Sequence, residues 1–193
     1  MFGIILCMFG SIFMLTASAE ETGKITLLCQ TYDGIIMKGM HWDIYKVGVC
    51  DENNNYILQG EFEKYPVSLE DTSTSAITDA AYTLENYAEI DQITPMTSAD
   101  ADENGRLSFS GLETGLYLLS GDFVKIDDVF YFPSAFLVNI YPGETNYDMT
   151  VHPKYIIKHG DDSDQTFTVK KIWENDTEQN RSVYITADIY RDN

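Results

Sequence analysis

The residues best suited to bind a metal ion lie near the middle of the chain. Asp100, Asp102 and Asn104 follow the order D-x-D-x-N-G, which matches the first half of a calcium-binding loop. The carboxylate that such a loop needs at its twelfth position is missing, because Gly111 stands there. A strand pattern follows in place of a helix, and Asn-Gly is a frequent hairpin turn. We therefore expect a turn here, with no metal ion or cofactor.

Other side chains that could do chemistry form weak patterns. The three histidines, His41, His152 and His159, lack the spacing of metal ligands. The sequence has no Ser-His-Asp or Cys-His signature, and no glycine-rich phosphate loop. Glu113, within GLETGLY, is the strongest single acid–base candidate, but its neighbours favour a turn residue. The sequence therefore favours a protein that is not an enzyme, although its many carboxylates leave a paired-acid hydrolase open.

Two lysines flank the acidic segment 159–165. Lys154 comes directly after a proline at the end of a strand pattern, where an exposed amine would be accessible to another protein. A solvated lysine after a strand-ending proline is the plainer alternative. The alternation of residues 166–173 places Lys171 on the same face as Trp173. A lysine that faces a protein interior is costly without a partner. If Lys171 faces inward, its position therefore needs a chemical explanation. The alternative is that Lys170 faces inward and Lys171 is solvated.

Short strand patterns surround these residues. They cover 24–30, 41–47, 55–62, 65–69, 106–109, 115–120, 122–126, 129–132, 135–141 and 146–152. Many short strands separated by turn residues predict a mainly β fold, an Ig-like or prealbumin-like β-sandwich. Residues 73–91 differ, because their apolar residues recur at helical spacing behind a possible serine cap. We expect one inserted amphipathic helix against a sheet, with a partner-binding helix as the alternative.

The charge of the chain limits its partners. The 193 residues carry a formal net charge of −19, which disfavours nucleic acid and anionic membranes as partners. An acidic surface also has the simpler role of keeping a protein soluble. The hydrophobic content of 44% is too high for a disordered acidic chain.

The beginning of the chain is typical of an export signal. Residues 1–19 contain an apolar run that ends in Ala-Ser-Ala, which predicts a signal peptide cleaved after Ala19. A membrane anchor is the alternative, but the run is short and no stop-transfer pattern follows. We expect contact with the membrane only during export. We also expect a β-sandwich domain over 20–158, an acidic hinge over 159–165, and the truncated start of a second β-sandwich module over 166–193.

Two cysteines remain after the predicted cleavage. An exported chain permits a disulfide between Cys29 and Cys50. If residues 25–30 and 41–49 formed a hairpin, Cys29 would lie opposite a residue near Ile44 and not opposite Cys50. We therefore favour buried free thiols, with a disulfide in another register as the alternative.

Four stretches carry a resemblance to a known family. The run TSADADENGRLSFSGLETGLYLL looks like the D-A-x-G-x-x-x-F-x-G-L-x-x-G-x-Y-x-L core of prealbumin-like modules in Gram-positive surface proteins and pilins. The stretches AFLVNIY and NYDMTVHPK resemble the strands that end the first such module in pilin shaft subunits. Residues 167–193 are similar to the opening of a collagen-adhesin B-type repeat. The resemblance implies a cell-wall surface location.

The resemblance implies roles for both lysines. In pilin shafts, a lysine in a Y-P-K-N-like motif is the nucleophile that a sortase joins to the C-terminus of the next subunit; the matching residue is Lys154, although His152 replaces the tyrosine and Tyr155 the asparagine. These modules also form an isopeptide bond between a lysine on the first strand and an asparagine on the last. Lys171 matches that lysine, but its partner strand lies beyond this chain. We expect no such bond in the first module, because 24–30 has no lysine at an interior position.

Three functions remain as hypotheses. The leading one is a structural or adhesive surface subunit of pilin type, whose partners are a sortase and other subunits. The second is a module that binds a host protein, matrix component or glycan. The third is an accessory domain of an exported enzyme.

Overall fold

The computed structural model describes residues 22–51, 55–141 and 147–160. The predicted signal peptide with its cleavage after Ala19, residues 161–165 of the predicted hinge, and the predicted second module with Lys171 lie outside the described residues.

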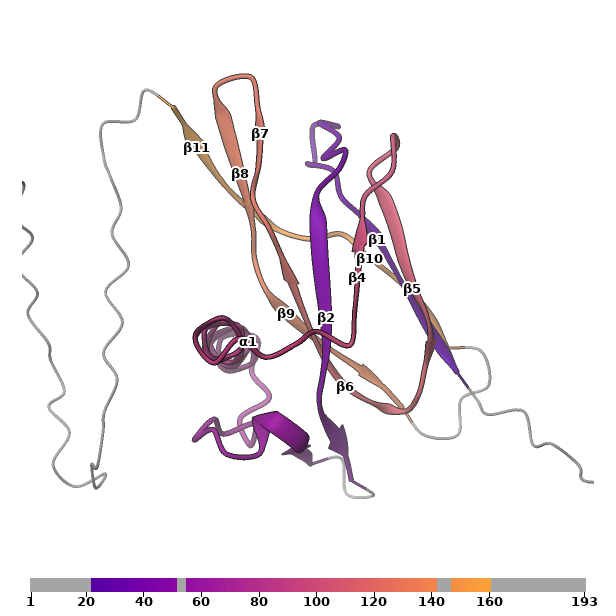
Figure 1. Cartoon of the computed structure of the whole chain (residues 1–193), viewed down its shortest axis with the longest axis vertical. Coiled ribbons are helices and arrows are strands. Elements are labelled where there is room, and N and C mark those ends of the chain that lie inside the picture. The colour runs from indigo at the N-terminus through magenta and orange to yellow at the C-terminus, as the bar shows by residue number, and fades with distance from the viewer. Residues whose placement is uncertain (1–21, 52–54, 142–146, 161–193) are drawn as a thin grey trace, which may run out of the picture.

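The described chain is mainly β with one α-helix, which confirms the predicted fold class (Figure 1). In chain order the elements are β1 (Gly23–Leu28), β2 (His41–Cys50), β3 (Tyr56–Leu58), the 3-10 helix η1 (Gly60–Phe62), α1 (Thr74–Ile90), β4 (Thr97–Asp100), β5 (Arg106–Leu112), β6 (Gly115–Gly121), β7 (Val124–Ile126), β8 (Val129–Pro133), β9 (Phe136–Ile140), β10 (Asp148–Val151) and β11 (Tyr155–His159).

The strands form three sheets. The first has the order β10-β1-β5, with β1 parallel to β10 and antiparallel to β5. The second is five-stranded: β3-β2-β6-β9 is its main path, and β4 pairs with the same strand β2. The third, β11-β8-β7, continues from the end of the sandwich and is drawn at the upper left of Figure 1.

The main core lies between the sheets. Alternate residues of β1 and β5 point into it, and they meet side chains of β2, β6 and β9. Trp42, on β2, is fully buried there and packs edge-on against Phe136, with ring centroids 5.7 Å apart. Its fully buried aliphatic members are Ile25, Leu27, Ile44, Leu112 and Leu119. Burial of this apolar surface provides the main driving force for the sandwich.

A second core covers the other face of the five-stranded sheet. Helix α1 presents Ala80, Ala81, Leu84 and Ala88 to this face, as their helical spacing predicted. The facing sheet residues include Val47 and Leu118, and the segment 62–69 closes the cluster. The five-stranded sheet is therefore buried on both faces, which explains why residues 115–119 of β6 are buried without alternation.

The start of α1 agrees with the sequence. Ser73 is the N-cap, and its hydroxyl accepts a hydrogen bond from the Ala76 N–H at 3.4 Å. On the sheet side, Glu85 accepts a hydrogen bond from the Ser120 hydroxyl at 2.6 Å, and burial raises the pKa of this glutamic acid. The expectation of an amphipathic helix packed on a sheet is confirmed.

Two strand predictions were wrong, and two strands were missed. The strand expected over 55–62 is limited to β3 and is followed by η1, and residues 65–69 form no strand. Strand β4 was missed, because Thr97–Asp100 has no apolar alternation and is fixed by pairing with β2. The chain does not stop pairing at residue 152 either. Strand β11 continues to His159, the first residue of the expected hinge, because its backbone pairs with β8.

The hairpin considered for residues 25–30 and 41–49 does not form. Strands β1 and β2 belong to different sheets, so they form no hairpin. Cys29 is buried and Cys50 partly buried, and both are free thiols.

Among the described residues, no helix has both the length and the apolar character needed to cross a bilayer.

Candidate functional site

Lys154 lies in the short turn that connects β10 to β11. The side chains on either side of it are turned toward the protein: Pro153 is buried and Tyr155 packs against the main core. Burial raises the pKa of Tyr155 far above its usual range. Because neighbouring side chains in extended backbone point in opposite directions, the Lys154 side chain points outward, and it is exposed.

The backbone of this turn is held in place from the neighbouring connection. The N–H of Ser134, between β8 and β9, donates a hydrogen bond to the carbonyl oxygen of Lys154 at 2.9 Å. One residue later, the ladder between β11 and β8 begins with Tyr155 opposite Pro133. Lys154 is therefore an exposed side chain on a fixed backbone.

The turn borders a groove. A cavity of about 250 Å³ lies beside it, lined by Thr78 of α1, residues 134–136 and residues 151–154. On another side, His152 and Pro153 border a hollow shared with residues 30–32. The groove therefore lies directly beside the exposed lysine. Sequence reasoning missed Ser134 and Ala135 as walls of this groove, and only the Pro-Ser-Ala break between two strand patterns hinted at them.

The surroundings of Lys154 differ from those of other lysines. Ion pairs hold four described lysines: Lys38 with Glu103, Lys46 with Glu113, Lys64 with Asp91, and Lys125 with Asp128. Lys158 lies over the ring of Phe132. Within residues 22–51, 55–141 and 147–160, only Lys24 and Lys154 have neither an ion pair nor a ring contact, and Lys24 is only partly exposed.

Glu113 is a turn residue, as its neighbours indicated. It lies in the turn between β5 and β6 and is exposed. Its carboxylate accepts a hydrogen bond from Lys46 Nζ at 2.9 Å, and this lysine holds the pKa of Glu113 below its usual range. The Tyr117 hydroxyl donates to the Glu113 carbonyl oxygen at 2.8 Å. These contacts give Glu113 a role in fixing the turn.

The residues that resembled a calcium loop form the turn between β4 and β5. One carboxylate oxygen of Asp102 accepts the N–H groups of Asn104 and Arg106, each at 2.8 Å. Gly105 adopts a φ of 71°, which favours glycine. Asp100 instead accepts a hydrogen bond from His41 Nδ1 at 2.6 Å. No group of three or more His, Cys, Asp or Glu side chains suited to a metal ion occurs in the part of the chain that the structure describes.

Comparisons with known proteins give matches among solved structures. No protein-family model matches the chain, and no curated protein matches it. The T6 backbone pilin of serotype M6 Streptococcus pyogenes is 18% identical over 72% of this chain and 29% of its own, with a TM-score of 0.47. The major pilin SpaD of Corynebacterium diphtheriae is 20% identical over 69% of this chain and 30% of its own, with a TM-score of 0.38.

A third match is GBS52, the minor pilin of Streptococcus agalactiae. It is 16% identical over 79% of this chain and 49% of its own, with a TM-score of 0.35. These structural neighbours are pilin subunits of Gram-positive bacteria. The matched part of this chain spans 29% and 30% of the length of the first two pilins.

Proposed function

We propose that this protein is a pilin-type structural subunit of a bacterial surface, and that a sortase joins it to the next subunit through Lys154. The sequence around Lys154 resembles the linkage motif of pilin shafts. The work of such a subunit is mechanical, because β-sandwich modules are linked end to end and carry no chemistry of their own after assembly.

The observation that carries this proposal is the free amine of Lys154 on a fixed backbone. A linkage lysine must be accessible to an enzyme that already holds a second protein chain, so its side chain has to be exposed and its position reproducible. Lys154 is exposed, has no ion pair or ring contact among the described residues, and borders the groove formed by 134–136 and 151–154. The lysines that are held in ion pairs would have to break them first.

The chemistry that the resemblance implies is formation of an amide bond. The neutral Lys154 amine attacks the acyl group at the C-terminus of another subunit, the bond between that acyl group and the sortase breaks, and the amine loses a proton. The two positions that differ from the motif are His152 and Tyr155. Tyr155 packs into the main core, so this position has a structural role here.

The test is the substitution Lys154→Ala in cells that express the matching sortase. We expect the ladder of covalent polymers on a denaturing gel to disappear, while secretion of the monomer continues. Lys24→Ala is the matched control, because Lys24 also lacks a charged partner but is partly buried on β1. Unchanged ladders in Lys154→Ala would refute the role of this lysine.

We further propose that residues 166–193 open a second module whose isopeptide lysine is Lys171. The support is the alternating pattern of 166–173 and its similarity to the start of a collagen-adhesin B-type repeat. In the complete protein, the bond would release one ammonia, which intact-mass measurement detects. We expect Lys171→Ala to restore the unmodified mass, and a wild-type mass equal to that of the sequence would rule the bond out.

A further inference from the structure

The sheet β11-β8-β7 has one face that packs partly on the main core and one face that does not; on the first, Ile157 of β11 remains 49% exposed. Its inner face packs on the main core through Val124, Ile126, Val129, Tyr131 and Tyr155. The strand register places Ile156 opposite Phe132, and Lys158 opposite Phe130, on the other face. Lys125 pairs with Phe130 from the β7 side. Phe123, Lys125, Phe130, Phe132, Ile156 and Lys158 form this outer surface, which we call the phenylalanine face.

The three rings of the phenylalanine face lie against one another. The ring centroids of Phe123 and Phe132 are 5.3 Å apart, and those of Phe130 and Phe132 are 6.3 Å apart with an interplanar angle of 20°. Phe123 is nevertheless 56% exposed and Ile156 is 51% exposed. An exposed apolar group of this kind, on a surface that is otherwise charged, is a feature of contact sites.

Two cations frame the rings. Lys125 Nζ lies 5.1 Å from the centroid of Phe130, and Lys158 Nζ lies 5.6 Å from that of Phe132. The whole chain has only 12 lysines and arginines against 31 acidic residues. Lys125 also pairs with Asp128, so Lys158 is the cation of this face without an ion pair among the described residues. The phenylalanine face therefore combines apolar surface with one unpaired positive charge, and a partner that fits it has apolar side chains and carboxylates.

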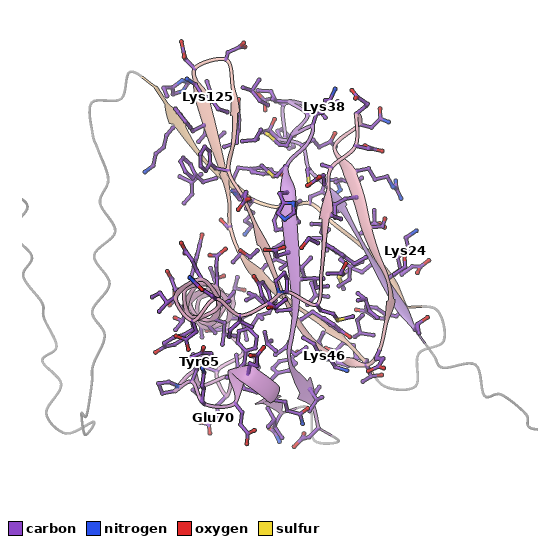
Figure 2. The ribbon with its side chains drawn as sticks, viewed as in Figure 1. Lys24, Lys38, Lys46, Tyr65, Glu70 and Lys125 are labelled. Atoms are coloured by element: carbon purple, nitrogen blue, oxygen red, sulfur yellow. The ribbon has the colours of Figure 1, made fainter. Side chains whose placement is uncertain are left out.

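The segment that follows β11 has both properties. The N–H of Gly160 donates to the Asp128 carbonyl oxygen at 2.6 Å, so the chain leaves the described fold at the tip of the β7–β8 hairpin. Figure 2 labels Lys125 at this end of the molecule. Residues 161–164 contain three aspartates, and apolar and aromatic residues begin again at Phe167. Six intervening residues reach at most about 22 Å, which keeps the following segment at a high effective concentration near the face.

We propose that residues 161–193 dock on the phenylalanine face and so fix the angle at which the next part of the protein leaves the first domain. In this arrangement the aspartates of 161–164 would lie near Lys158, and side chains of the segment that follows would cover Phe123 and Phe132. A second copy of the chain fits the face less well, because both copies carry a large negative charge. This inference does not depend on polymerisation through Lys154.

The test is NMR on the 193-residue chain with isotope-labelled phenylalanine. We expect nuclear Overhauser effects between the rings of Phe123, Phe130 and Phe132 and protons of residues 161–193. The double substitution Phe123→Ser with Phe132→Ser should remove them, whereas Ile57→Ser, at an apolar residue 47% exposed on β3, should leave them intact.

Two outcomes would overturn the proposal. One is the absence of such effects in the wild-type chain. The other is their appearance only between labelled and unlabelled molecules in a mixed sample, which would identify a second copy as the occupant. A reversal of charge provides a further test. Lys158→Glu should weaken the nuclear Overhauser effects between the rings and residues 161–193. Lys38→Glu, at a lysine paired with Glu103, should leave them unchanged.

Discussion

The five-stranded sheet and the β11-β8-β7 sheet differ in how many of their faces are covered. The five-stranded sheet has the main core on one face and α1 on the other. The β11-β8-β7 sheet is only partly covered on its inner face, where β11 leaves Ile157 exposed, and its outer face exposes Phe123 and Ile156. The first sheet therefore holds the fold together, and the second, with the Lys154 turn at its start, has side chains free for contacts with other chains.

The largest difference between the two sheets should appear in stability. Trp42→Ala removes a fully buried ring from the five-stranded sheet and should lower the free energy of unfolding by about 3–5 kcal/mol. Phe123→Ala removes an exposed ring beside β7 and should cost less than about 1 kcal/mol. Urea denaturation of both variants measures this contrast, and equal losses would show that the comparison is wrong.

The helix layer should behave like the main core. Leu84 is fully buried between α1 and the sheet, so Leu84→Ala should lower the free energy of unfolding by about 2–5 kcal/mol. Glu89→Ala, at an exposed position of the same helix, should have little effect. A small loss in Leu84→Ala, measured by urea denaturation, would mean that α1 does not cover the sheet tightly.

A smaller loss is expected at the start of α1. Ser73→Ala removes the N-cap oxygen that accepts the Ala76 N–H, and should cost about 1 kcal/mol. Thr74→Ala, at the next and exposed residue, keeps that bond and serves as the control. Thermal unfolding followed by circular dichroism distinguishes the two variants, and an equal effect would argue against the cap.

The smallest effect depends on pH. The hydrogen bond to Asp100 raises the pKa of His41 above its ordinary value of 6.5, and nearby Asp43 adds to this. The stabilisation is present below the unfolded-state pKa and is lost as the pH rises through the folded-state pKa. His41→Gln should therefore lower stability at about pH 5 more than at about pH 9, where imidazole is neutral. A loss independent of pH, measured by urea denaturation, would contradict this role of the ion pair between β2 and β4.

The sequence predicted those parts of the fold that are fixed locally. Alternation predicted β2, helical spacing predicted α1, and the turn residues around Glu113 predicted the connection between β5 and β6. Pairing between distant segments could not be predicted in this way. Residues 97–100 form the strand β4 because they pair with β2. Strand β1 pairs with β5 and β10, and nothing in the sequences of these strands indicates which strands pair with one another.

The role of Lys154 stays a prediction. The sequence predicted this lysine just before the expected hinge, and the structure places it exposed between β10 and β11, with the strand β11 between it and residue 160. The groove walls at Ser134 and Ala135 come from a connection 20 residues earlier, so their closeness depends on the tertiary fold. The phenylalanine face was missed because the outward orientation of Phe130 and Phe132 becomes visible only in the register with β11.

Tandem mass spectrometry of sortase-assembled polymer tests the central claim most directly. After proteolysis, we predict a branched peptide in which the ε-amine of Lys154 carries the C-terminal residues of a second subunit. A branch at another lysine, such as Lys24, together with an unmodified Lys154 peptide, would contradict the account.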